Sequence, residues 1–338
     1  MDWSKKSALE IVEATREALT ENDEWKTRYA DYAKKMKENL SIIKEKKSLF
    51  NEFDPLFLYM TIGEAKSTTA FQLRYRGQIV ADLYVENGVV SITTDGYDEK
   101  NRRDFDCSLV LKDQPWRSQE AQGFRKHFAN APIRSHESPK GNEEHRLESL
   151  LLSEFEKTDR ISKRIVNIQP VSIAAIARFQ MKTPFSGSKL SEIKYSTHNG
   201  GGIDILARIG IGKAVRLCVM EVKDENKKTE PPYAVIRQAL LYATFIRELL
   251  RSESGAMWWE LFGFTGAIPR SLSITVACVM PHAEGSDLSF DGESIGIDFD
   301  TLKLRYMYFK ETDNVITEIK TSIPQCAVSG ATGLGSKE

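Results

Sequence analysis

The sequence predicts an α+β fold with more than one domain, on three observations. Apolar residues recur every three or four positions, the period of an amphipathic helix, in four segments: 4–20, 23–48, 143–157 and 229–251. In residues 69–112 the period changes to two, which is typical of strands with one solvated face. After residue 203, short β-branched runs predict buried strands, and 271–280, 295–299, 302–309 and 315–319 complete a second sheet.

The composition is that of an ordinary globular chain. Of 338 residues, 41% are hydrophobic and 28% are charged, so the chain can bury a sizeable core. No apolar run is long enough to span a bilayer, and the N-terminus lacks the apolar core of a signal peptide. The net charge of −1 gives no global basic field, so any nucleic-acid surface must be local. We expect a cytoplasmic protein whose scattered cysteines are small core residues.

Residues 1–130 predict a helical hairpin followed by a four-stranded antiparallel sheet. The lysine-rich face of the second helix is interpreted as solvated, with a homodimer contact or a phosphate-backbone contact as alternatives. Asn87-Gly88 predicts a tight turn within the sheet. The fourth strand is predicted from apolar residues that alternate after a charged loop: Phe105, Cys107, Leu109 and Leu111. With no catalytic constellation here, we expect a structural or recognition role.

The composition of residues 131–142 predicts a linker. Residues 143–328 then form the second predicted domain, and 329–338 are expected to be a disordered tail.

The most informative stretch is Gly200–Lys223, where two apolar runs flank a short turn and predict a hairpin of buried strands. Asp204 is set into the first run, and the second run ends in Glu221 and Lys223. Charged groups at the ends of buried strands are costly unless something uses them. The strand period places Glu221 and Lys223 on one face, and a simple register brings Asp204 beside them. Two carboxylates and an ammonium so arranged can hold a hard divalent cation and an attacking water.

Two helices carry further candidate groups. Glu144 and Glu148 lie one turn apart beside the apolar stripe of the helix at 143–157, where a solvated acidic face is the alternative interpretation. Gln238 and Tyr242 lie one turn apart on the apolar stripe of the later helix. Buried amides and phenols need partners, which a scissile phosphate, the Lys223 amine or the backbone could supply.

The segment at 182–202 is predicted to be a long basic loop. It could wrap a phosphodiester backbone or serve as a plain connector, and the sequence does not favour either. Its candidate substrate-binding residues are Lys182, Lys189, Lys194 and His198.

An acidic residue two positions before a lysine is common in this chain, so context separates Glu221–Lys223 from the others. It ends a strongly apolar run, follows an aspartate in a second apolar run and precedes a long apolar helix. The best rival is Glu318–Lys320, which also ends a predicted strand but is followed only by a short segment.

This ordered set resembles the PD-(D/E)XK nuclease superfamily, in the QxxxY variant related to the RecB nuclease domain. The resemblance covers roughly residues 140–320, although Gly202-Ile203 stands where the superfamily name has a proline. It implies a restriction-endonuclease-like αβββαβ core with a mixed central sheet flanked by helices. The matching residues are Glu148 or Glu144, Asp204, Glu221 with Lys223, and Gln238 with Tyr242.

The resemblance also implies a Mg²⁺-dependent nuclease, with Mn²⁺ as a substitute, that hydrolyses phosphodiester bonds. Asp204, Glu221 and the Val222 carbonyl would bind the metal, completed by Glu148, with Glu144 as its substitute. Lys223 would position the attacking water. Gln238 and Tyr242 would hold the substrate or the catalytic groups.

DNA is the first expected partner and RNA the alternative, with a prophage or defence role among the pathways that fit. One rival hypothesis is a catalytically inactive nucleic-acid-binding module of the same fold. The other is a partner-binding protein of a phage or defence system that uses the N-terminal hairpin and a Trp258-Trp259 patch.

Overall fold

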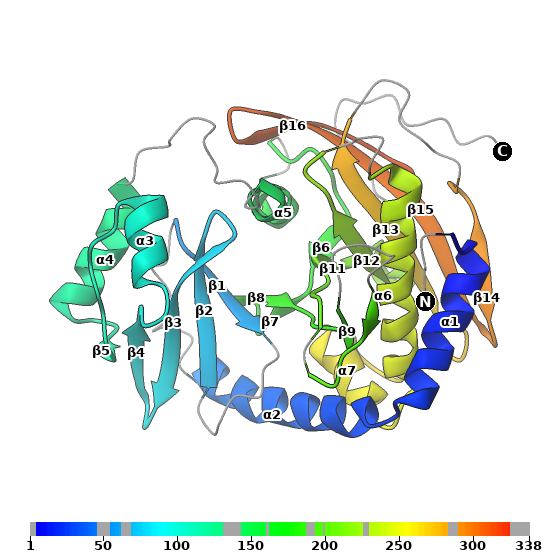
Figure 1. The fold of residues 1–338 in the computed structure, drawn as a ribbon, viewed down its shortest axis with the longest axis horizontal. Coiled ribbons are helices and arrows are strands. Elements are labelled where there is room, and N and C mark those ends of the chain that lie inside the picture. The colour runs from blue at the N-terminus through cyan, green and yellow to red at the C-terminus, as the bar shows by residue number, and fades with distance from the viewer. Residues whose placement is uncertain are drawn as a thin grey trace. The chain divides into compact units, whose positions relative to one another are not determined.

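The contacts divide the chain into two compact units. Unit 1 comprises residues 1–34, 150–171 and 181–338, and unit 2 comprises 35–149 and 172–180. The computed structural model (Figure 1) describes residues 5–45, 55–61, 69–130, 143–159, 162–186, 193–198, 200–225, 230–282 and 290–324. Helices and mixed sheets occur together, so the α+β class is confirmed.

Unit 1 is built on a seven-stranded mixed sheet in which β12, β13 and β15 are mutually parallel and the outer strands are antiparallel to their neighbours. The parallel centre explains the continuous apolar run of β13, because such strands are covered on both faces. The strand order is β14 (Ser294–Ile297), β15 (Asp300–Thr312), β13 (Ser273–Pro281), β12 (Arg216–Val222), β11 (Ile205–Ile209) and β6 (Ile168–Pro170), with β16 (Val315–Thr321) beside β15.

The helix α6 (Pro232–Arg251) packs against β12, β13 and β15 and is nearly all buried. A proline at its first position suits a helix start, because the missing N–H has no helical partner there. The helix α1 (Ala8–Glu21) packs on α6 and begins with a capping box between Ser7 and Glu10. The short α7 (Gly255–Leu261) follows α6.

The first part of α2 (Trp25–Glu45) belongs to unit 1 and joins an aromatic cluster. The Trp25 and Tyr29 rings lie 5.7 Å and 4.9 Å from the Phe245 ring of α6, and the Trp258 indole N–H donates to the Tyr29 carbonyl. The predicted helical hairpin is therefore present, and Trp25 and Tyr29 of its unit-1 part are buried within this chain.

Unit 2 contains a second seven-stranded sheet, in which β1, β2, β3, β4 and β5 are consecutive antiparallel neighbours and β8 adds in parallel to β1. The helices α3 (Asp98–Phe105) and α4 (Gln119–Asn130) follow the strands, and the helix α5 (Glu143–Glu156) runs from unit 2 into unit 1 at residue 150. The sheet order is β5 (Gln114–Pro115), β4 (Val89–Thr93), β3 (Gln78–Glu86), β2 (Thr69–Tyr75), β1 (Phe57–Thr61), β8 (Ala177–Gln180) and β7 (Ser172–Ile173).

The predicted fourth strand of the meander is wrong. Phe105 ends α3, and the residues that follow it form no strand before β5. Acidic residues in the first turn of α3 and arginines in its last turn suit the helix dipole. A strand with one buried face would bury all of these alternating residues. Cys107 and Leu111 are buried, but Leu109 is 38% exposed.

The predicted domain boundary also differs from the observed division, since the two units interleave along the chain. Unit 1 takes α1 from the N-terminus, and unit 2 takes β7 and β8 from the later half. The cause is pairing between distant segments, as in α1 with α6 and β8 with β1. The predicted linker at 131–142 and tail at 329–338 lie outside the described residues.

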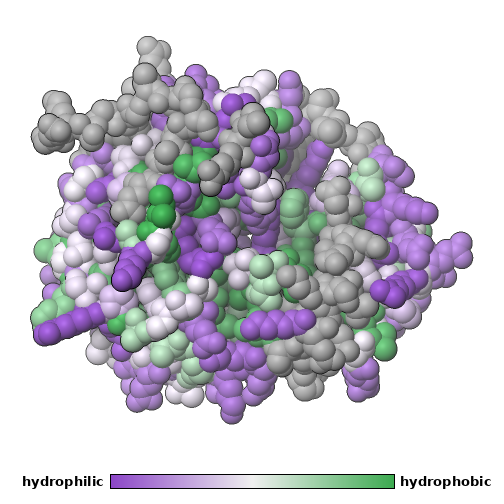
Figure 2. Space-filling view, turned by 180° about the vertical axis from the view of Figure 1, so that it is seen from behind, coloured by the Kyte–Doolittle hydropathy of each residue, from purple (hydrophilic) through white to green (hydrophobic). Residues whose placement is uncertain are grey.

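Figure 2 shows hydrophilic side chains over much of one face of the molecule, with hydrophobic ones dispersed among them. Trp258 and Trp259 are 0% and 6% exposed, so the predicted tryptophan patch is core rather than surface. Cys107, Cys218 and Cys278 are buried, as expected of small core residues. No described helix combines the length and the apolar character needed to cross a membrane.

A buried ion-pair network ties α6 to β15. The Arg247 Nε donates to Asp300 Oδ2 at 2.8 Å, and Arg251 and the Leu272 N–H bind the same carboxylate. Burial alone raises the pKa of Asp300, but the hydrogen bonds from Arg251, Leu272 and Arg247 outweigh it, so the net pKa lies below its ordinary value. Arg16 of α1 joins the network through Glu248 at 2.9 Å.

We expect Asp300→Asn to lower the free energy of unfolding at pH 7 by about 3 kcal/mol, because it leaves buried arginine charge without its carboxylate. The folded pKa of Asp300 lies below the unfolded one, so its contribution is full above pH ~4 and is lost as the pH falls through the folded value. Urea unfolding of both proteins from pH 7 to pH 3 measures this difference. The prediction is contradicted if the free energies of unfolding of the two proteins differ little at pH 7, or if their difference does not decrease below pH 4.

Candidate active site

The register of β11 with β12 sets the geometry of the site. Ile205 pairs with Met220, so the next position outward sets Asp204 opposite Glu221. At that point the ladder ends, and the Asp204 carboxylate takes the place of a backbone acceptor: the Val222 N–H donates to Asp204 Oδ2 at 2.7 Å. This bond confirms that Asp204 lies beside the end of β12.

Glu221 and Lys223 lie on the same face at the end of β12, as the strand period predicts. The Lys223 Nζ donates to Glu221 Oε1 at 2.9 Å, and the two side chains are only 7% and 2% exposed. β12 is an inner strand between β11 and β13, which accounts for the burial. Removing two charges from water is costly and is only partly compensated by their mutual attraction.

The helix α6 places two polar side chains against this group. The Gln238 amide donates to the Tyr242 hydroxyl at 3.4 Å, and these side chains lie one helical turn apart on the buried face. Burial, and then the negative charge of Glu221, raise the pKa of the Tyr242 phenol well above its ordinary value, with smaller effects from Asp204 and Lys223. Tyr242 is therefore a neutral hydrogen-bonding group close to both carboxylates at physiological pH.

Gly200 and Gly201 form a closely packed segment, the glycine strap, beside Tyr242 and Phe185. A Cβ on Gly201 would lie 2.9 Å from the Tyr242 hydroxyl, and a Cβ on Gly200 would lie 2.1 Å from the Phe185 carbonyl oxygen. The strap is pinned by backbone bonds from Gly200 N–H to Thr183 and from Gly201 N–H to Phe185. The sequence indicated these glycines only as loop residues. Three consecutive glycines before a strand that bears an acid are the pattern that could have predicted this close packing.

The predicted basic loop is anchored at both ends in its described parts. Lys182 forms a bridge with Gly202, and two short strands, β9 (Phe185–Ser186) and β10 (Lys194–Tyr195), pair within the loop. Arg28 of α2 donates to the carbonyl of Ser196 at 3.3 Å. Lys194 and His198 are exposed, and Lys189 lies outside the described residues.

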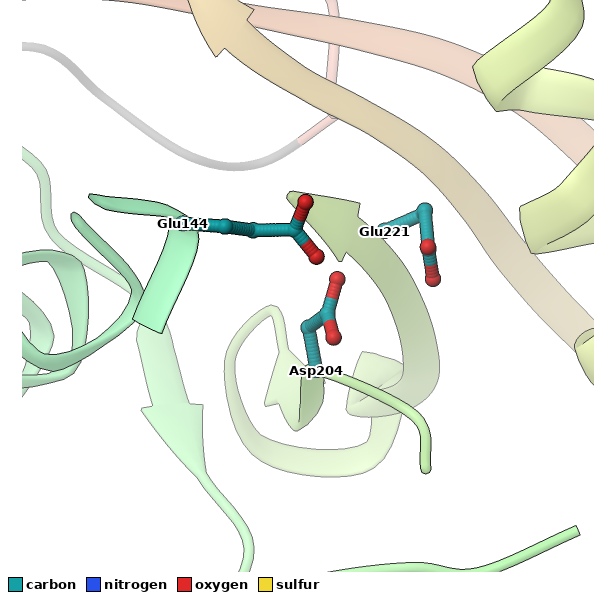
Figure 3. A group of neighbouring side chains, drawn as sticks. All are labelled: Glu144, Asp204 and Glu221. Atoms are coloured by element: carbon teal, nitrogen blue, oxygen red, sulfur yellow. The ribbon is translucent and has the colours of Figure 1, made fainter. Parts of the chain in front are cut away.

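Figure 3 draws the carboxylates of Asp204 and Glu221 at the paired ends of β11 and β12, both in unit 1. Glu144, which the figure also draws, belongs to unit 2, so the candidate site is built from the two strand carboxylates. Glu148 also belongs to unit 2; its carboxylate lies 3.4 Å from His145 Nδ1, and its charge acts on Tyr59. The choice between Glu148 and Glu144 as the helix carboxylate stays a prediction.

The donor set is suited to a hard cation. Asp204 and Glu221 present carboxylate oxygens at paired strand ends, and the Val222 carbonyl is the third oxygen that the resemblance implies. Mg²⁺ prefers oxygen ligands and keeps several of its waters, so two carboxylates and a carbonyl suffice to hold it. The neighbouring ammonium of Lys223 is a hydrogen-bond donor to anions and water.

No protein-family model matches the chain, and neither a curated protein nor a solved structure is significantly similar to it. The site is therefore defined by its own geometry.

Gly200→Ala should destabilise the strap, because its new methyl group would meet the rigid Phe185 backbone. We expect a loss of about 1–3 kcal/mol in the free energy of unfolding, the usual cost of overpacking. Gly296→Ala is the matched control, since a Cβ there has nothing within 4 Å. Thermal and urea unfolding measure both variants. Equal stability of the two variants contradicts the close packing described for Gly200.

Proposed function

We propose that this protein is a metal-dependent phosphodiester hydrolase, most simply a Mg²⁺-dependent deoxyribonuclease. The observation that carries the proposal is the convergence of Asp204, Glu221 and Lys223 at the paired ends of β11 and β12. A carboxylate pair with an adjacent ammonium is the donor set that cation-assisted phosphodiester hydrolysis requires.

The cost of this arrangement supports a functional role. Glu221 and Lys223 are 2% and 7% exposed, and taking both charges out of water is costly. A buried ion pair is weak evidence for stability, since an apolar pair of similar size would often serve as well or better.

The order of the elements that carry the candidate residues also supports the proposal. Asp204 precedes β11, Glu221 and Lys223 stand at the end of β12, and the Gln238–Tyr242 pair follows on α6. β6 to β10 intervene between α5 and β11, and α7 intervenes between α6 and β13. We propose membership of the PD-(D/E)XK superfamily on the order of these residues.

In this mechanism Asp204 and Glu221 would hold Mg²⁺, with the Val222 carbonyl as a third ligand. When bound, the cation supplies Lewis acidity and lowers the pKa of a coordinated water. The Val222 N–H holds one oxygen of Asp204, which orients that carboxylate before any ligand arrives. Lys223 would orient the attacking water or donate to a nonbridging phosphate oxygen, and Tyr242 would remain protonated and donate to substrate or to Glu221.

The rival roles differ in what they require of the same residues. An inactive nucleic-acid-binding module would bind DNA without cleavage and without a metal requirement. A partner-binding role was expected to use the N-terminal hairpin and the Trp258-Trp259 patch, and both of these indoles are buried. The metal-dependent hydrolase accounts for more of the described geometry than either rival.

Asp204→Asn and Lys223→Gln should each abolish cleavage, because each removes a charge from the centre; Asp204→Asn does so with side-chain size nearly unchanged. A loss of at least 100-fold in rate is expected, comparable with removal of one electrostatic group from an active site. The assay follows linear, circular and single-stranded DNA with Mg²⁺, Mn²⁺ or EDTA, and circular dichroism checks the fold of each variant.

The chain offers a matched control in Glu318 and Lys320, a second acid–x–lysine pair on a strand, with Nζ 3.3 Å from the carboxylate but with side chains about a third exposed, at 34% and 29%. Glu318→Gln and Lys320→Gln should leave cleavage unchanged. If the wild-type protein still cleaves DNA in EDTA, this site is not the catalytic centre. The same conclusion follows if folded Asp204→Asn protein cleaves DNA at the wild-type rate.

A further inference from the structure

The sheet of unit 1 has a pocket on its second face. Adjacent paired residues of a sheet share a face, so the register assigns each strand residue to one side. Cys218 pairs with Thr275 and Thr275 with Lys303, whereas Glu221 pairs with Cys278. Since faces alternate along a strand, Thr275 and Lys303 lie on the face opposite Glu221.

This pocket is small and strongly basic. Its volume is about 140 Å³, well below the roughly 300–1,000 Å³ of pockets that enclose drug-sized ligands, so it suits an ion-sized group. Arg216, Lys303 and Arg305 line it together with the hydroxyl-bearing Thr275, and Ile209 and Pro324 form apolar walls.

The positive charge of the pocket is not neutralised by described residues. Among the parts of the chain that the structure describes, Arg216 and Lys303 have no ion pair, and Arg305 donates only to the Leu304 carbonyl. Lys303 and Arg305 are two residues apart on one strand, about 7 Å, and half-buried, so their charges repel each other. No residue that the register places on this face, up to the bulge after Lys310, is acidic.

A buried hydroxyl completes an anion-binding set. Thr275 is 1% exposed and lines the pocket with the cations, where its hydroxyl can donate a hydrogen bond. Cations and a neutral donor around a small recess whose lining holds no carboxylate are suited to an oxyanion.

The pocket is separate from the candidate active site. Besides lying on the opposite face, Arg216 stands at the start of β12 and Glu221 near its end, about 17 Å apart along the strand. Loss of one site therefore need not impair the other.

We propose that this pocket is a second site that binds a phosphate group. The ligand is either a free phosphate or phosphomonoester, or one phosphate of a nucleic-acid strand; both present the same tetrahedral oxyanion. Arg216, Lys303 and Arg305 supply charge, and Thr275 supplies a neutral donor.

The test is calorimetric titration of the full chain with sodium phosphate at constant ionic strength, in EDTA. The wild type should bind phosphate at one site, and the double variant Lys303→Gln/Arg305→Gln should bind it at least tenfold more weakly. The control Lys112→Gln/Arg117→Gln removes the same charge from exposed positions of unit 2 and should bind as the wild type does. Circular dichroism and thermal unfolding confirm that each protein is folded.

Two further arms separate the ligand sources and the two sites. A short oligonucleotide whose binding weakens in the Lys303/Arg305 variant indicates a strand phosphate, and one whose binding is unchanged indicates a free phosphate or monoester. Asp204→Asn should retain phosphate binding whether or not the hydrolase proposal is correct. The proposal is overturned if the wild type binds no phosphate, if the pocket variant binds it equally well, or if the control loses it equally.

Discussion

The pairing of β11 with β12 is the constraint on which the candidate active site depends. With Ile205 opposite Met220, Asp204 reaches the end of its partner strand and accepts from the Val222 N–H. A slip of one residue would reverse the faces of one strand against the other and separate Asp204 from Glu221. The register is well specified, because both strands are buried and the 3₁₀ turn η3 (Gly212–Ala214) between them is short.

Unit 1 uses charge in three different ways on the same sheet. The Arg247–Asp300 network connects helix to strand and is satisfied by several donors, so its role is structural. The Glu221–Lys223 pair is buried and lies beside a carboxylate and a buried phenol, an arrangement that suits cation binding. The cations around Arg305 face no acid on their side of the sheet, which suits a bound anion. Burial and connectivity, rather than residue type, separate these roles.

The sequence predicted well what depends on neighbouring residues. The helix bearing Gln238 and Tyr242, the hairpin with Asp204 and the shared face of Glu221 and Lys223 all follow from periodicities that the structure retains. The predicted domain boundary was wrong, because contacts between distant segments determine the units. The helix α1 packs on α6 far along the chain, so no single position in the sequence separates the two units. Apolar alternation around Cys107 suggested a strand, but the charges of the preceding segment favour a helix.

Metal binding tests the central claim most directly, because it does not require the right substrate to be found. Calorimetric titration with Mn²⁺ should show one site in the wild type, at least tenfold weaker binding in Asp204→Asn, and unchanged binding in Glu318→Gln. The same affinity in the wild type and a folded Asp204→Asn protein, or no binding at all, would contradict the assignment of a cation-binding centre at the ends of β11 and β12.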